Sequence, residues 1–253
     1  MSAKEERLIE LSNTKSIALK ISISGIMSAV TCVVTIIVSI SIPASQGFFN
    51  IGESMVYLSA ILFGPYIGAI SGGIGSMMAD LILGYPGYAI GTLIIKGLEG
   101  FIVGYLYQLM SKKERSKKLY AFIFVCSMIL LGLILILIFN PRELPILDAL
   151  QFLFEIIIAG DSFVWLMVSL SSLITVILIS VILRLFVDKD TSNKMLSMLS
   201  GGIVMVIGYF LYATLVMGIA GAYIEMPFNV LQSIIGILIA VPISIPIKKQ
   251  LRI

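Results

Sequence analysis

Histidine is absent from this chain of 253 residues, and cysteine occurs only twice. Without histidine, the chain lacks the usual base of Ser-His and Cys-His catalysis and the most common transition-metal ligand. Cys32 and Cys126 both lie in apolar runs, which indicates buried thiols rather than a disulfide framework. We therefore expect no catalytic residues, no metal site and no cofactor.

Charge is also scarce. Only 12% of the residues are charged and 59% are hydrophobic, and the mean hydropathy is +1.10. Soluble domains contain about 25% charged residues, so this composition indicates an integral membrane protein. The sequence has no G-x-x-x-x-G-K-[ST] loop, which means that any ATP hydrolysis must come from partner proteins. It also has no basic patch for nucleic acid.

Apolar runs recur along the whole chain, and each is bounded by polar residues. They predict a single all-α polytopic membrane domain over residues 1–253, a bundle of about eight transmembrane spans with seven as the alternative count. The segment 51–64 is short for a span, at about 21 Å. The runs cover residues 17–42, 51–64, 66–83, 87–110, 119–140, 162–187, 197–222 and 227–247.

Basic residues predict the orientation. All but two of the 17 lysines and arginines fall in four clusters: before residue 21, at 112–118, at 184–194 and after 247. Basic loops stay cytoplasmic, so we expect both termini inside. For the basic loop at 112–118 to lie on the cytoplasmic side as well, the chain must cross the membrane three times between Phe48 and Ser111, with a turn at Phe63-Gly64-Pro65. Between the spans, residues 141–161 carry apolar positions at helical spacing and predict an amphipathic surface helix on the outer side, a connector, with a lid over a pocket as the alternative.

The stretch from Asn50 to Gly100 combines charges with a ladder of small residues at every fourth position, Gly64, Gly68, Gly72 and Ser76. Small residues at this spacing let helices pack closely, so the ladder predicts helix contacts. Ionisable residues at membrane depth are costly and often functional. With the predicted topology, polar and aromatic residues of several spans converge towards the outer face. The candidate ligand-binding residues are Asn50, Glu53, Asp80, Tyr85, Tyr88, Lys96, Tyr209, Asn229 and Gln232.

Each candidate has a structural alternative. Lys96 and Glu99 are three residues apart and could form an ion pair within one helix. Asp80 could anchor a helix end, and Tyr85 and Tyr88 could be interfacial-belt tyrosines. We expect Glu225 to be exposed in an outer loop at 223–226.

The first span carries a second small-residue face, in which Gly25 and Ala29, and likewise Ser24 and Ser28, are four residues apart. Such pairs are docking surfaces for another helix. That helix could belong to this chain or to a partner subunit.

Two long runs carry a family resemblance. LFGPYIGAISGGIGSMMADLILGYP, followed by TLIIKGLEGFIVG, and the closing GGIVMVIGYFLY and MPFNVLQSIIGILIAVPI resemble substrate-binding S components of energy-coupling factor (ECF) vitamin transporters. The resemblance implies a multi-pass plasma-membrane subunit that captures a vitamin-like small molecule from outside. Its implied partners are a transmembrane coupling subunit and two cytoplasmic ATPases, with Gly25 and Ala29 facing the coupling subunit. Members usually have six spans, so residues 119–187 would be an insertion of two further spans.

Other functions are compatible with the composition. A stand-alone transporter could couple to protons or sodium through Glu53, Asp80, Lys96 and Glu99, although no inverted repeat is visible. An intramembrane enzyme would have to use a Ser-Lys or Asp pair, and no motif supports one. A purely structural scaffold would leave the charges of the outer half without a purpose.

Overall fold

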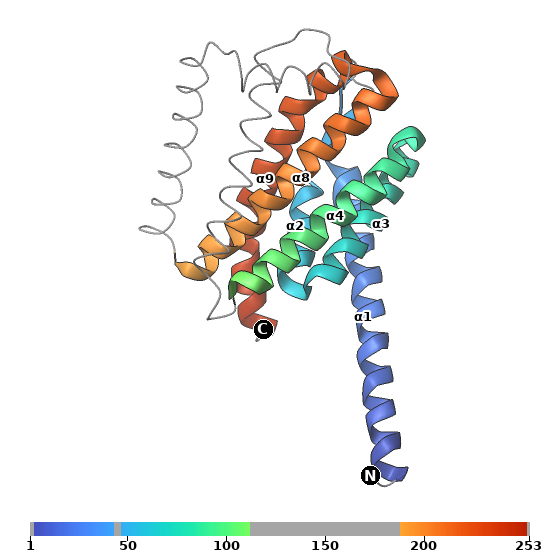
Figure 1. Cartoon of the computed structure of the whole chain (residues 1–253), viewed down its shortest axis with the longest axis vertical. Coiled ribbons are helices and arrows are strands. Elements are labelled where there is room, and N and C mark those ends of the chain that lie inside the picture. Colours follow the sequence, from blue (N-terminus) through green and yellow to red (C-terminus); the bar gives the residue numbers. More distant parts are fainter. Residues whose placement is uncertain (1–2, 43–46, 112–187, 252–253) are drawn as a thin grey trace, which may run out of the picture. The chain divides into compact units, whose positions relative to one another are not determined.

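Six helices and one β-hairpin make up the described part of the chain, residues 3–42, 47–111 and 188–251 of a computed structural model (Figure 1). The contacts discussed here lie within one compact unit, formed by Met1–Ser111 and Lys194–Ile253. The predicted spans 119–140 and 162–187 and the predicted surface helix 141–161 lie outside the described residues.

Helix α1 (Ala3–Ile37) ends earlier than the apolar run predicted. The run continues to residue 42, but after the helix the chain forms strand β1 (Ser39–Ile42), which pairs antiparallel with β2 (Gly47–Asn50). The alternation Ser-Ile-Ser-Ile has the two-residue period of a strand, and isoleucine favours extended backbone. A hydropathy count does not distinguish this strand from the last turn of a helix.

Helices α2 (Glu53–Phe63), α3 (Pro65–Leu83) and α4 (Pro86–Ser111) confirm the three predicted segments. The turn lies at Gly64, whose φ of 89° is disfavoured for residues with a side chain. Pro65 then starts α3, where a missing N–H costs no helical hydrogen bond. Gly84, with φ of 86°, ends α3 in a left-handed conformation.

Two of the four ladder residues, Gly68 and Gly72, pack helix against helix as predicted, whereas Gly64 forms the turn before α3 and Ser76 lines the pocket described below. A Cβ on Gly68 would lie 2.8 Å from the Gly100 oxygen and 2.7 Å from the Ala60 Cβ, and one on Gly72 would lie 2.7 Å from the Lys96 oxygen. Only glycine allows such an approach. The pairing of residue 68 with 100 and of residue 72 with 96 makes α3 and α4 antiparallel.

Helix α8 (Lys189–Met217) starts before the predicted residue 197. Its first turn is capped by Asp188, whose side chain accepts a hydrogen bond from the Thr191 N–H at 3.0 Å. The hydrogen bonds from Thr191 lower the pKa of the Asp188 carboxyl below its usual value.

Helix α9 (Ile219–Leu251) corrects the predicted outer loop at 223–226, which is helical. The chain reverses earlier, at Gly218, whose φ is 80°. Pro227 lies inside α9 without ending it. Membrane helices tolerate proline where neighbouring groups satisfy the freed carbonyl.

Five described helical segments are long and apolar enough to cross a membrane: Ser16–Ile37, Pro65–Leu83, Pro86–Ser111, Lys189–Met217 and Ile224–Gln250. Helix α2 has 11 residues, about half the length needed. It contacts α1, α3, α4 and α9 and is almost entirely buried, so it forms the centre of the unit (Figure 1). The predicted count of eight spans is not confirmed by these helices.

Candidate functional site

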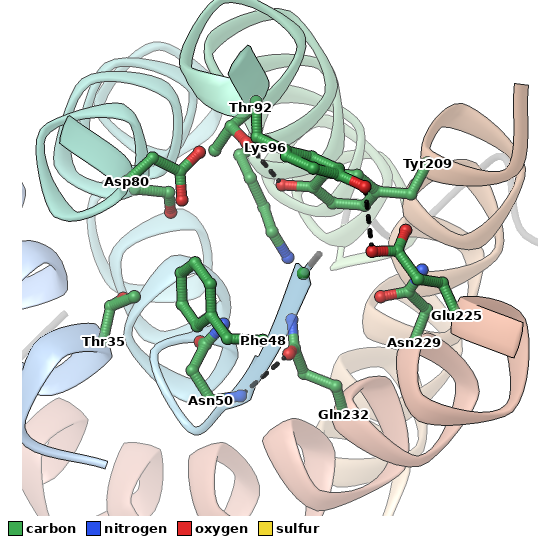
Figure 2. Close-up of a pocket in the computed structure, with 13 residues that line it drawn as sticks. Thr35, Phe48, Asn50, Asp80, Thr92, Lys96, Tyr209, Glu225, Asn229 and Gln232 are labelled. Carbon is green, nitrogen blue, oxygen red and sulfur yellow. Dashed lines mark hydrogen bonds between the residues drawn. The ribbon is translucent and has the colours of Figure 1, made fainter. Parts of the chain in front are cut away.

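A pocket lies at the end of the unit where α1 ends, α2 begins, the chain turns from α3 to α4, and α8 is followed by α9. It encloses about 460 Å³ of empty space, part of it open to solvent. It is lined by Thr35, Gly47, Phe48, Asn50, Ser76, Asp80, Tyr88, Thr92, Lys96, Tyr209, Glu225, Asn229 and Gln232 (Figure 2).

A local turn positions the start of α2 beside the pocket. The Asn50 side chain accepts a hydrogen bond from the Gly52 N–H at 2.9 Å, and the Asn50 N–H donates to Gln232 Oε1 at 3.1 Å. Asparagine favours such turns because its side chain can bond to the backbone two residues on. The turn fixes β2 to α9 and places Glu53 in the first turn of α2, where the helix dipole favours an acid.

Lys96 joins two helices through a buried ion-pair cluster. Its ammonium pairs with Glu53 of α2 and, at 3.1 Å, with Glu99 of its own helix. The Gln232 amide also donates to Glu53, at 3.1 Å. All three charged residues are at most 3% exposed. The sequence offered an ion pair between Lys96 and Glu99 within one helix as the alternative to ligand binding, and the structure has this pair. Glu53 of α2 joins it, so the cluster connects two helices.

The Lys96 side chain nevertheless reaches the pocket, where Tyr209 covers it with a centroid distance of 5.7 Å (Figure 2). Breaking a buried ion pair by removing one partner costs about 3–5 kcal/mol. Glu53 and Glu99 therefore hold Lys96 in one position at the pocket wall.

Tyrosine hydroxyls organise the part of the wall that α4, α8 and α9 form. Tyr88 donates to Glu225 at 3.0 Å, and Tyr209 donates to Thr92 at 3.0 Å. Glu225 is only 6% exposed, which corrects the expectation of an exposed loop residue. The reason is that 223–226 is helical, which turns Glu225 towards Tyr88.

Asp80 completes the polar lining from α3. It is 4% exposed, and its Oδ2 atom has no hydrogen-bond partner. Figure 2 shows its carboxylate directed into the same space as the Lys96 ammonium. Among the described residues, no group of three metal-ligating acids or cysteines is found.

The structure thus brings most of the sequence candidates to one pocket, although whether they bind a ligand stays a prediction. Asn50, Asp80, Tyr88, Lys96, Tyr209, Asn229 and Gln232 line it. Glu53 lies behind Lys96. Tyr85 is not part of the lining; its ring packs on Phe48 with centroids 4.9 Å apart, and its hydroxyl donates to Ser41 at 3.2 Å.

Sequence reasoning missed six lining residues: Thr35, Gly47, Phe48, Ser76, Thr92 and Glu225. Helical spacing could have found two of them, because Ser76 lies one turn before Asp80 and Thr92 lies between Tyr88 and Lys96 on one face. Phe48 had no such signal, since its position depends on the hairpin.

The two small-residue pairs of α1 differ in exposure. Ser24 is buried, and the Ser28 hydroxyl lies 3.4 Å from the Ile70 oxygen of α3. Gly25 and Ala29 are exposed, and a Cβ on Gly25 would meet nothing within 4 Å. One pair therefore packs within the unit, and the other is exposed on α1.

Parts of this sequence are similar to known proteins. Residues 15–180 match the family described as ECF-type riboflavin transporter, S component. The chain belongs to this family. The match runs to residue 180 and includes most of the segment predicted as an insertion.

Two relatives cover parts of the S component. This chain is 56% identical to "Uncharacterized protein in gap 3'region" of Pyrococcus woesei over 73 residues, which are 29% of this chain and 49% of the relative. Over 97 residues, 38% of this chain and 58% of the relative, it is 31% identical to the thiamine precursor transporter HmpT of Lactococcus lactis subsp. cremoris. The chain thus spans about half the length of these relatives. The family and the apolar helices together make it a multi-pass membrane protein.

Proposed function

We propose that this S component captures a vitamin or vitamin precursor from outside the cell for an ATP-driven ECF importer. The observation that carries the proposal is the pocket, where aromatic, amide and carboxyl side chains from five elements meet at one end of the unit. Pockets for small polar ligands combine such groups with apolar walls. Family membership and the similarity to a thiamine precursor transporter support the same class of ligand.

The distribution of basic residues supports an outward-facing pocket. The basic clusters lie before the spanning part of α1, after α4, around the start of α8 and at the end of α9. Every one of these positions is at the helix end away from the pocket. Because basic loops remain cytoplasmic, the pocket opens to the outside and both termini lie inside.

The proposed partners are a transmembrane coupling subunit and two cytoplasmic ATPases, and the S component itself is not an enzyme. The exposed Gly25 and Ala29 support a docking surface on α1, because small side chains let a partner helix approach closely. Gly25→Leu combined with Ala29→Leu should abolish ATP-driven uptake by the assembled importer and leave ligand binding unchanged. Uptake at the wild-type rate would contradict this surface.

Binding by the full chain in detergent tests the proposal. Mass spectrometry should find a small molecule that co-purifies, and calorimetry should show saturable binding of it. Asp80→Ala should weaken binding directly, and Glu53→Ala should weaken it because Lys96 loses one of the two acids that hold it at the pocket wall. Asp188→Ala, an exposed acid, is the control. Undiminished binding in both pocket variants would refute the site.

An ion-coupled secondary transporter is the second candidate, because three ionisable groups are buried beside the pocket. Such groups mark ion pathways in other membrane proteins. Proteoliposomes that contain this chain alone separate the two functions. Uptake driven by a proton or sodium gradient would favour the second candidate, and uptake only with ATP and the partner subunits would favour the first.

A further inference from the structure

We propose that the ligand is a basic, planar nitrogen heterocycle of the aminopyrimidine kind, bound as a cation through the carboxylate of Asp80. This assignment rests on the proposed function and names the chemistry of the same pocket. It is carried by three features of the lining: a buried acid with one oxygen that accepts no hydrogen bond, a lysine that is already neutralised, and aromatic side chains around both.

The first feature is the carboxylate of Asp80. It is 4% exposed and lines the pocket, and its Oδ2 atom accepts no hydrogen bond. Within the described part of the chain, no basic side chain lies within ion-pairing distance of it. A buried carboxylate oxygen that accepts no hydrogen bond, on an acid with no ion-pair partner, is costly. A ligand that brings an N–H group with positive charge removes that cost.

The second feature is the state of Lys96. It lies at the pocket wall, but its ammonium is paired with both Glu53 and Glu99. Two carboxyl groups thus share one ammonium, which leaves no excess positive charge for an anionic ligand. A phosphate or carboxylate group of a ligand would lie near the two acids Asp80 and Glu225, and Lys96 would not offset their repulsion because it is already paired. The cluster therefore selects against anions.

The third feature is the aromatic lining. Phe48, Tyr88 and Tyr209 come from three different elements and line the same pocket as Asp80. Figure 2 shows Phe48 and Tyr209 on either side of the space that the Asp80 carboxylate faces. Flat rings accept planar partners by stacking, and a ring with positive charge gains further from their electron-rich faces. The Asn229 side chain supplies an amide for the remaining polar groups of such a ring.

Calorimetry on the full chain in lipid nanodiscs tests this assignment with three probes. Two are basic, an aminopyrimidine alcohol and thiamine, and one is riboflavin, a neutral flavin. The wild-type protein should bind a basic probe at least about tenfold more tightly than riboflavin. Asp80→Asn should weaken that binding at least about tenfold, because a hydrogen bond to a charged group contributes on this scale.

Two further variants show whether a loss of binding comes from the missing charge or from misfolding. Asp80→Glu keeps the charge and should retain most of the affinity for the basic probe. Asp188→Asn makes the same chemical change at an exposed acid and should behave like the wild type. A monodisperse Asp80→Asn protein that binds the basic probes with wild-type affinity would overturn the assignment.

The outcome also separates this assignment from the proposed function. Tighter binding of riboflavin, or no binding of either basic probe, overturns the cationic ligand. The proposed function survives that result if the preparation binds riboflavin or carries another small molecule. If no ligand binds or co-purifies, both fail together.

Discussion

Helices α3 and α4 meet in two different ways along their length. Near the turn that precedes α3, backbone lies against backbone: a Cβ on Gly104 would lie 2.6 Å from the Pro65 nitrogen, and one on Gly100 would lie 2.2 Å from the Gly68 oxygen. Towards the other end, the same two helices present Asp80 and Thr92 to a pocket.

This difference separates two tasks within one helix pair. The glycine contacts fix the distance between the helices by close packing, which any larger side chain would disturb. The polar end can then hold charged groups at fixed positions although their burial is costly. Stability should therefore depend chiefly on the glycine contacts and the ion-pair cluster, and binding should depend on the pocket side chains.

The largest effect is expected where backbone meets backbone. Gly100→Leu would place a side chain against the Gly68 carbonyl group, and the helices cannot separate without moving α2. Overpacking of a tight core costs about 3 kcal/mol or more in such cases. The variant should yield little monodisperse protein and a strongly lowered melting temperature in detergent.

Gly97→Ala is the matched control on the same helix, since its Cβ would lie at an ordinary 3.6 Å from the Ala69 oxygen. It should melt at the wild-type temperature or slightly above, because alanine favours helix. If Gly100→Leu melts as the control does, the packing of the glycine end is not what fixes the two helices.

The next largest effect is expected at the ion-pair cluster. Lys96→Met leaves Glu53 and Glu99 buried without their cation, which should lower the free energy of unfolding by about 3–5 kcal/mol. Adding Glu53→Gln and Glu99→Gln should recover most of that loss. Thermal unfolding of the single and triple variants measures both.

Lys249→Met, at an exposed position of α9, removes the same charge without burial and is the control. Its melting temperature should stay within a few degrees of the wild type. A triple variant as unstable as Lys96→Met would show that the loss comes from packing around the lysine stem rather than from unpaired acids.

A smaller effect on binding alone is expected at Asn229, which lines the pocket from α9. Asn229→Ala removes an amide that can bond to the ligand, and one neutral hydrogen bond contributes about 0.5–1.5 kcal/mol. Affinity should fall about two- to tenfold in calorimetry, while the melting temperature without ligand stays unchanged. Gln250→Ala, at the exposed end of α9, is the control; equal affinities would remove Asn229 from the site.

Local signals in the sequence predicted the frame of the site. Gly64 and Pro65 marked the turn between α2 and α3, because glycine tolerates a positive φ and proline, which lacks an N–H, is suited to the first position of a helix. The distribution of basic loops predicted three crossings between Phe48 and Ser111; the structure has three helices there, of which α3 and α4 are long enough to span and α2, with 11 residues, is not. Helical spacing then carried Asp80 and Lys96 to the same end of the bundle.

What the sequence could not predict depends on contacts between distant segments. The hairpin brings Phe48 to the pocket, but its first strand belongs to an apolar run whose hydropathy suits a helix equally well, and its second strand follows that run. The sequence predicts Glu53 as a ligand-binding residue and does not show that it pairs with Lys96, 43 residues away. The same holds for Glu225 and Tyr88, which are 137 residues apart.

The smallest effect is expected at Tyr85, which sequence reasoning placed in the site and the structure places behind it. Its hydroxyl bonds to Ser41 on the exposed side of the hairpin, at 3.2 Å, and its ring supports Phe48. Tyr85→Phe keeps the ring and removes one exposed hydrogen bond, so affinity should change by less than about twofold. Tyr88→Phe is the matched variant inside the pocket and should lower affinity more, because Glu225 loses its donor. If Tyr85→Phe instead weakens binding as much as Tyr88→Phe does, the outer side of the hairpin belongs to the binding site, and the boundary drawn between Tyr85 and the lining is wrong.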